Sequence, residues 1–115
     1  MVTIGSCELD STIMVIKLSG KIDTMTVNGI TTRVMAAMEE SPAGVMFNLG
    51  GVTFVSSAGL RMFVSAYKKG LSANMKMAMI HVHPSVYKIF KMVGCEGMFN
   101  IFDDEPQALK KIWGI

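Results

Sequence analysis

Two adjacent serines, Ser56 and Ser57, are the polar residues of this sequence best placed for chemistry. They follow a mostly apolar extended stretch, residues 52–55, and precede a segment that begins at Leu60 and has apolar residues at helical spacing. The first amide groups of a helix lack intrahelical partners and favour negative charge. A serine at this position can cap the helix, as serine commonly does, or it can carry a phosphate that the helix end tolerates. The residues alone leave both roles open.

Histidine and cysteine are the other residue types that could act as metal ligands or nucleophiles. His81 and His83 are two residues apart, so they would share one face of a strand that continued that far. A metal site needs further cysteine or carboxylate ligands, which the sequence does not place beside them. Cys7 and Cys95 belong to no Cys-x-x-Cys motif and have no suitably placed base. We therefore expect two reduced thiols, no metal site, no cofactor and no enzymatic activity; an enzyme that uses Cys95 or the histidines is the weakest alternative.

The composition excludes several classes of protein. The 115 residues are 50% hydrophobic and 17% charged, with a formal net charge of +2. Globular domains carry about 25% charged residues, and disordered chains combine low hydrophobicity with high net charge. This chain has the opposite balance and the length of one domain, so we expect a single folded domain spanning residues 1–115. The small, dispersed positive charge argues against nucleic-acid binding. The apolar runs are much shorter than the roughly 20 residues of a membrane span, and no signal peptide is recognisable, so we expect a cytoplasmic protein without direct membrane insertion.

Strands and helices alternate along the sequence. Strands are predicted where apolar residues alternate or run continuously: residues 2–4, 13–18, 45–49 with a continuation at 52–55, 75–82 and 98–102. Helices are predicted where apolar residues recur at helical spacing between residues that commonly begin or end a helix. These segments run from Asp23 and Thr24 to Ser41, from Leu60 to a Gly70 cap, from Pro84 to Gly94, and from Asp103 and Asp104 to Trp113. This order predicts an α/β fold with a mixed, mostly parallel sheet of about five strands and about four helices packed on it. Ligands and partners of such sheets gather at the carboxyl ends of strands, which again singles out the turn at Ser57.

Three segments carry a resemblance to a known family. They read Leu18-Ser19-Gly20-Lys21-Ile22-Asp23, then Gly51-Val52-Thr53-Phe54-Val55-Ser56-Ser57-Ala58-Gly59-Leu60-Arg61, and finally a helix that opens with Pro84-Ser85-Val86 and ends in Val93-Gly94. Together they resemble the STAS domain, in particular the bacterial anti-sigma factor antagonists, over nearly the whole chain.

The resemblance implies a partner switch controlled by phosphorylation. In this family the unphosphorylated antagonist binds an anti-sigma factor that is also a serine kinase, and so releases a sigma factor. The kinase inactivates the antagonist by phosphorylating one serine, and a PP2C-type phosphatase restores it. Carried over by position, the phosphate acceptor is Ser57. The sequence differs from the family on both sides of it, because Ser56 replaces the usual Asp and Ala58 replaces a second hydroxyl residue.

The resemblance also places the Asp23 loop beside Ser57 on the surface that faces the partner. The residues expected to bind the partner are Gly20, Lys21, Asp23, Thr24, Met25, Ser56, Ser57, Ala58, Gly59, Leu60, Arg61 and Met62. An alternative within the family is an accessory or scaffold protein of another system, such as a stress-signalling complex or a transporter.

Methionine is unusually frequent, with 12 residues. Methionines on the predicted strands are expected to fill the core; they include Met46, Met75, Met77 and Met79. Met25 and Met62 lie just beyond the Asp23 loop and the Ser57 turn, and one or both are expected to form an adaptable apolar docking patch.

Overall fold

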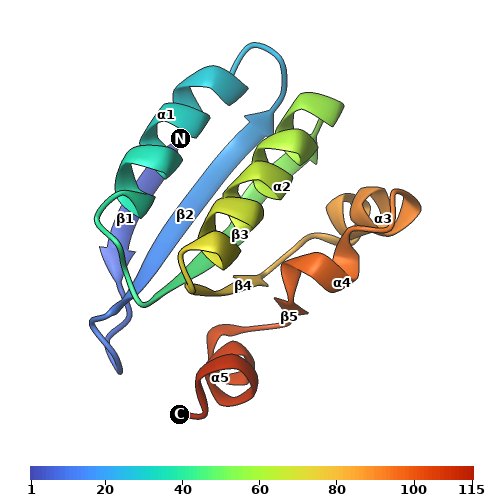
Figure 1. Ribbon diagram of the computed structural model, residues 1–115. Helices are drawn as coiled ribbons and strands as arrows, with labels where there is room; N and C mark the ends of the chain where they lie inside the picture. The colour runs from blue at the N-terminus through green and yellow to red at the C-terminus, as the bar shows by residue number, and fades with distance from the viewer.

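The computed structural model describes all of residues 1–115 and contains a five-stranded sheet in the order β1-β2-β3-β4-β5 (Figure 1). The strands are β1 (Val2–Ser6), β2 (Ile13–Ile22), β3 (Gly44–Val55), β4 (Lys76–Ile80) and β5 (Ile101–Phe102). β1 is antiparallel to β2, and the remaining neighbours are parallel. The predicted α/β architecture, with a mixed and mostly parallel sheet, is confirmed.

Helices cover both faces of this sheet. They are α1 (Val27–Met38), α2 (Ser57–Ser72), α3 (Pro84–Met92), α4 (Glu96–Phe99) and α5 (Glu105–Ala108), which continues into a π-helical turn (Leu109–Trp113). Figure 1 shows α1 and α2 side by side on one face, with α3 and α4 next to them beyond α2. Strand side chains alternate between the faces: Val45 and Phe47 pack in the core under α1 to α4, whereas Met46 packs with Ala108 and Leu109 on the opposite face.

The core under α2 is rich in aromatic rings and methionines. Phe63 of α2 packs edge-on against Phe47 and Phe90, and the Tyr67 ring stacks on Phe47. The Tyr67 hydroxyl donates a hydrogen bond of 2.6 Å to the carbonyl of Phe99, which ties α2 to α4. The strand methionines predicted to be core residues are all buried: Met46, Met75, Met77 and Met79.

Burial of Tyr67 predicts a loss of stability at alkaline pH. Desolvation raises the pKa of this phenol well above its ordinary value. The folded protein therefore keeps a proton that the unfolded chain releases above about pH 10, so this contribution is present below that pH and is lost as the pH rises towards the folded pKa. We expect the free energy of unfolding in urea to fall more steeply between about pH 8 and pH 11 for the wild type than for Tyr67→Phe. Tyr87→Phe, at an exposed tyrosine, is the matched control, and equal slopes for all three proteins would contradict this prediction.

Several predicted element ends are wrong for local reasons. Gly70 does not cap α2, which continues through it to Ser72. Gly70 instead permits close packing, because a Cβ atom there would lie 2.1 Å from the sulfur of Met77. β4 ends at Ile80, since His81 adopts a left-handed backbone with φ of 57°. His81 and His83 therefore do not share a strand face.

The strand predicted for residues 98–102 is reduced to the two residues of β5. Cys95, Met98 and Phe99 have helical spacing, and the single turn of α4 directs Phe99 into the aromatic core. By contrast, residues 45–49 and 52–55 form one continuous strand, β3, through the two glycines between them. Asp104 caps α5 as predicted, because its carboxylate accepts a 3.0 Å hydrogen bond from the amide of Gln107.

Candidate functional site

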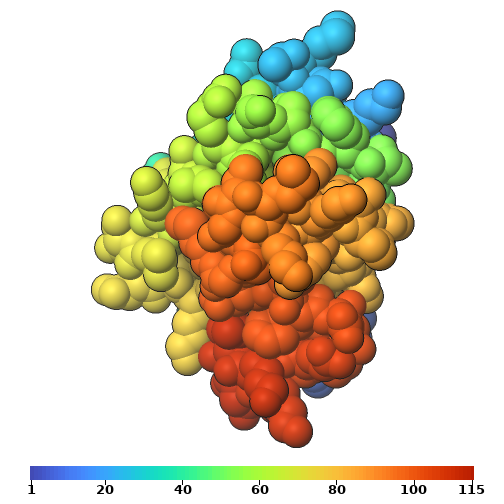
Figure 2. All heavy atoms as spheres, turned by 90° about the vertical axis from the view of Figure 1, so that its right-hand side faces the viewer, coloured from blue at the N-terminus to red at the C-terminus, as the bar shows by residue number.

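The ends of β2 and β3 bring the two sequence motifs together. Ile22 pairs with Val55 in the parallel register, so Asp23 and Ser56 leave the sheet at the same edge. The amide of Ser56 donates a 2.8 Å hydrogen bond to the carbonyl of Ile22, which joins the two connections directly. Figure 2 shows the result: at the top of the molecule, the blue atoms that follow β2 lie against the green atoms at the end of β3 and the start of α2.

Gly59 allows α2 to start this close to β2. A Cβ atom at this position would lie 2.8 Å from Cγ2 of Ile22 and 2.9 Å from its carbonyl oxygen, distances that real Cβ atoms essentially never show. The glycine is buried and its backbone φ is not positive, so the requirement is for space and not for a special conformation. Gly59 therefore shapes the site from below and does not present a contact at its surface.

The two serines have different roles at the start of α2. Ser56 is the N-cap, and its hydroxyl oxygen accepts a 3.2 Å hydrogen bond from the amide of Gly59. Ser57 is the first helical residue, is exposed, and makes no side-chain hydrogen bond. The capping role that the sequence left open for either serine thus belongs to Ser56, and the Ser57 hydroxyl remains free.

Removal of the cap should distinguish the two serines by stability. We expect Ser56→Ala to lower the free energy of unfolding by about 0.5–2 kcal/mol, because the Gly59 amide loses its acceptor. Ser57→Ala is the matched control and should stay within about 0.5 kcal/mol of the wild type, as exposed substitutions do. Urea unfolding of the two variants measures both values. A larger loss for Ser57→Ala than for Ser56→Ala would reverse the assignment of the cap.

Asp23 and Thr26 organise the loop between β2 and α1. The Asp23 carboxylate accepts hydrogen bonds from the amides of Met25 (2.9 Å) and Thr26 (3.1 Å), while the Asp23 amide donates to the Thr26 hydroxyl oxygen (3.0 Å). The Thr26 hydroxyl in turn donates to the carbonyl of Lys21 (2.8 Å). Thr26 directly precedes α1 but makes no side-chain cap bond. The carbonyl of Asp23 also accepts a 2.8 Å hydrogen bond from the Val27 amide, so Asp23 makes the bonds of an N-cap, as predicted, whereas Thr24 makes none of them. Sequence reasoning missed Thr26, although the spacing Asp23-x-x-Thr26 resembles the reciprocal pattern of a capping box.

The structure separates surface residues of this region from core residues. Met25 is 91% exposed, whereas Met62 is 4% exposed and packs in the main core. The expectation that Met62 belongs to a docking patch is therefore wrong. Phe54 was not anticipated: it pairs with Lys21 in the sheet register and is 44% exposed, and an exposed aromatic residue is typical of an interface.

We call the resulting exposed region the Ser57 surface. Its residues are Gly20, Lys21, Asp23, Thr24, Met25, Phe54, Ser56, Ser57, Ala58, Leu60 and Arg61, all of them exposed or half-buried. Gly20 has a left-handed backbone with φ of 86°, a conformation that favours glycine at the bulge before the loop.

The chemistry available on the Ser57 surface is binding and modification. Lys21 and Arg61 are exposed and form no ion pair, since the single ion pair of the structure joins Lys69 to Glu39 elsewhere. No histidine or carboxylate is hydrogen-bonded to Ser57, so the serine has no adjacent base to activate it as a nucleophile. The free amides at the start of α2 and the side chain of Arg61 are groups that can face an anion.

The remaining candidate ligands lie apart from one another. No group of three or more histidine, cysteine or acidic side chains is arranged to hold a metal ion. Nε2 of His83 is 2.8 Å from the carbonyl oxygen of Gly50. Cys7 is buried, Cys95 is half-buried, and both are free thiols. None of the helices combines the length and the apolar character needed to cross a bilayer.

Comparison with known proteins matches this architecture to one family. The model of the STAS domain family matches residues 6–108. The chain is a member of the STAS domain family. The anti-sigma F factor antagonist of Paenibacillus polymyxa is 25% identical to this STAS protein over 101 residues, which are 87% of this chain and 86% of that protein.

Two solved structures of SpoIIAA share the fold of this STAS domain. The unphosphorylated anti-sigma factor antagonist SpoIIAA aligns with a TM-score of 0.80 and 19% identity, over 100% of this chain and 98% of that one. The Bacillus cell fate determinant SpoIIAA in its phosphorylated form aligns with a TM-score of 0.71 and 18% identity, over 96% of this chain and 98% of that one. The predicted STAS architecture is therefore confirmed.

Proposed function

We propose that this STAS protein acts in the cytoplasm as an anti-sigma factor antagonist whose Ser57 surface binds the anti-sigma factor. In its unphosphorylated form the protein binds an anti-sigma factor that is also a serine kinase, and a sigma factor is released. Phosphorylation of Ser57 ends this binding, and a PP2C-type phosphatase restores it. The relative from Paenibacillus polymyxa, an anti-sigma F factor antagonist that aligns over most of both chains, supports this function.

The observation that carries the proposal is the free hydroxyl of Ser57. Ser56 already caps α2, so Ser57 has no structural hydrogen bond to give up when it is modified. The residue is exposed in the first turn of a helix, where the unpaired amides of Ser57 and Ala58 favour negative charge. A kinase could therefore reach the hydroxyl, and the folded domain would tolerate the product. SpoIIAA, which shares the fold, is known in a phosphorylated and an unphosphorylated form.

The phosphate would act on the partner and not on the fold. A phosphoserine adds about −1.5 to −2 charges and a bulky group to the Ser57 surface, whose single acidic residue is Asp23. A hundredfold loss of affinity requires about 2.7 kcal/mol, and unfavourable charges at an interface cost several kcal/mol. Repulsion or steric clash at the interface is sufficient, and no refolding of the domain is required.

Phosphorylation by a candidate anti-sigma factor kinase tests the proposal. The protein is incubated with the kinase and ATP, and the modified residue is located by mass spectrometry of the peptide that contains both serines. We expect one phosphate on Ser57, which is lost in Ser57→Ala and retained in Ser56→Ala, the matched control. Binding of the unmodified protein to the same kinase is measured in parallel by calorimetry. Modification of Ser56 or another residue would contradict the switch, and the absence of binding to any anti-sigma factor of its organism would contradict the function.

A further inference from the structure

The strand β1 forms an open edge of the sheet. β1 has a neighbour on one side only, so the side of this five-residue strand opposite β2 is open (Figure 1). Sheet edges of this kind are commonly protected by charged residues, proline, bulges or very short length. The opposite edge, β5, is two residues long. β1 contains no charged residue, no proline and no bulge, so the strand itself supplies none of these protections.

The hydrogen-bonding pattern shows which backbone groups are free. Bonds from the Ser19 amide to the Met1 carbonyl and from the Cys7 amide to the Ile13 carbonyl fix the alternation of the β1–β2 ladder. In an antiparallel pair, alternate residues bond to the neighbouring strand and the residues between them face away. The backbone groups of Val2, Ile4 and Ser6 therefore point to the open side.

One of these outward groups has a partner within the chain. Nη1 of Arg33, from α1, donates a 2.6 Å hydrogen bond to the carbonyl of Val2. This contact confirms that the Val2 carbonyl points outwards, and it places a guanidinium group at one end of the edge. The amides and carbonyls of Ile4 and Ser6 remain without partners.

We propose that β1 pairs with β1 of a second copy of this chain to form a symmetric dimer with a continuous ten-stranded sheet. The strands run antiparallel with the two-fold axis at Gly5, so that Ile4 of each copy lies opposite Ser6 of the other. In this register every free amide and carbonyl of Ile4 and Ser6 finds a partner on the other copy, which gives four hydrogen bonds between the two strands. Gly5 meets its counterpart in the non-hydrogen-bonded position between these pairs, and the space around its Cβ position is open within the chain.

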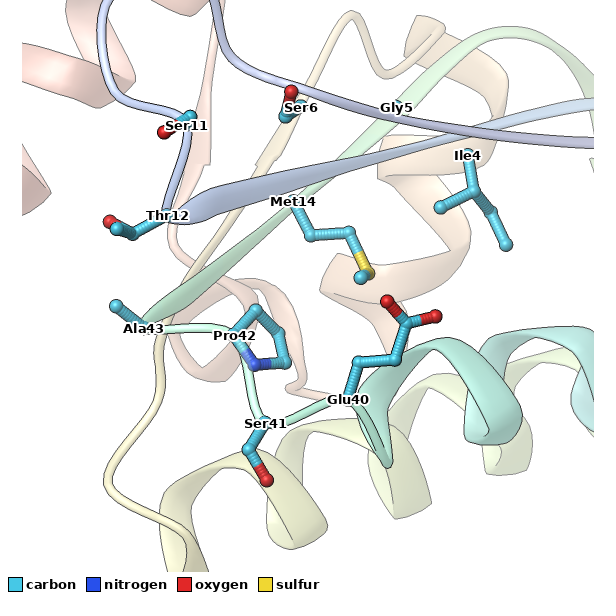
Figure 3. Close-up of a pocket in the computed structure, with 10 residues that line it drawn as sticks. All are labelled: Ile4, Gly5, Ser6, Ser11, Thr12, Met14, Glu40, Ser41, Pro42 and Ala43. Atoms are coloured by element: carbon cyan, nitrogen blue, oxygen red, sulfur yellow. The ribbon is translucent and has the colours of Figure 1, made fainter.

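Charge and shape beside the open edge of β1 also fit a second copy of this chain. Glu8 lies in the bend that follows β1, so this register brings the Glu8 of one copy to the same end of the interface as Val2 of the other and the Arg33 guanidinium bound there. The surface beside β1 is hollowed between the β1–β2 hairpin and the connection from α1 to β3, with a volume of about 630 Å³ (Figure 3). The side chains of Ile4, Met14 and Glu40 line this hollow. Ile4 of the second copy, opposite Ser6, would lie at its mouth and cover apolar surface.

The dimer leaves the Ser57 surface accessible. Ser6 pairs with Met14 near the beginning of β2, whereas the Ser57 surface adjoins the last residue of β2, Ile22. The two-fold axis at Gly5, which pairs with Val15, therefore lies towards the start of β2, and the other end of β1 reaches Leu18, four residues before Ile22. Dimer formation is independent of the proposed function, and each can be tested without the other.

Sedimentation of the full chain across a concentration range tests the proposal. We expect the wild type to reach twice the chain mass as its concentration rises from low micromolar to near millimolar. Gly5→Lys should raise the dimer dissociation constant by about tenfold or more, because it places two like charges opposite each other at the axis. Gly5→Thr is the matched control: it fills the same open space without charge and should preserve the dimer. A wild type that stays monomeric throughout, or a Gly5→Lys variant that dimerises like the wild type, would overturn the proposal.

Charge reversal tests the register. Arg33→Glu and Glu8→Arg should each weaken the dimer, and the double variant should recover most of the loss because the pair is restored with its signs exchanged. If both single variants weaken the dimer and the double variant recovers nothing, the antiparallel register is wrong. Circular dichroism of each variant confirms that the monomer remains folded.

Discussion

Ser57→Asp is expected to weaken binding to the anti-sigma factor by about a hundredfold, which corresponds to about 2.7 kcal/mol. The substitution places a permanent negative charge at the centre of the Ser57 surface, in the position of the proposed phosphate. An unfavourable charge buried at an interface costs several kcal/mol, so this magnitude requires no change in the fold. Isothermal titration calorimetry with the purified partner measures the affinity directly.

The same variant should unfold like the wild type. An acidic residue in the first turn of a helix interacts favourably with the unpaired amides, by about 0.3–1 kcal/mol. Arg61 lies one helical turn further along α2, at the spacing where opposite charges on a helix attract each other. We therefore expect a free energy of unfolding equal to that of the wild type or slightly higher.

Ser57→Asn is the matched control for the charge. Asparagine has nearly the size of aspartate but is neutral, so a switch that depends on charge should leave most of its affinity intact. An equal loss for Ser57→Asn and Ser57→Asp would indicate that steric fit decides binding. If Ser57→Asp binds as tightly as the wild type, the proposed switch is wrong.

Met62→Ala is expected to lower the free energy of unfolding by about 2–5 kcal/mol, the range for removal of a buried methionine side chain. Met62 is 4% exposed and belongs to the main core with Phe63 and Ala66, so truncation leaves a cavity beneath α2. Chemical denaturation measures the loss. The folded fraction of Met62→Ala should bind the partner with nearly wild-type affinity, because Met62 does not reach the Ser57 surface.

Met25→Ala is the converse control. Its side chain is 91% exposed, so we expect a change in stability of less than about 0.5 kcal/mol. If Met25 contributes apolar contact to the proposed interface, its truncation should weaken partner binding while the fold is unaffected. An undiminished affinity for Met25→Ala would remove it from the interface, and a stable Met62→Ala would contradict the packing of α2.

The position of the site was predictable from the sequence because it depends on local patterns. An apolar strand followed by two serines and a helical repeat was sufficient to place Ser57 at a strand–helix turn. The pairing of Ile22 with Val55, which brings the Asp23 loop beside this turn, is a long-range feature. Periodicity does not report it, and only the family resemblance suggested it.

The error over Met62 has an identifiable cause. The large apolar residues of α2 that recur at helical spacing are Leu60, Phe63, Val64 and Tyr67, and taken alone they predict the buried face of the helix. In the structure Leu60 and Val64 are half-buried, and the buried face includes Gly59, Met62, Ala66 and Gly70. Small residues contribute little to an apolar pattern, yet they determine which side of a helix can approach a sheet closely. The helix is thus rotated relative to the prediction, and Met62 turns inwards.

The contact of Ile22 with Ser56 and Gly59 has a consequence for how partner choice could change. The backbones that carry Lys21, Met25 and Arg61 are held in place by the buried residue Ile22, which accepts a hydrogen bond from Ser56 and packs against Gly59. The hydrogen bond from Thr26 to the carbonyl of Lys21 holds the loop after β2. A partner that binds there would not need to order these segments, so little of its interaction energy is lost to conformational entropy. The exposed side chains could then be exchanged with little effect on folding. Libraries restricted to these three positions should therefore yield domains that recognise different partners, so that several antagonists could operate in one cell without cross-talk.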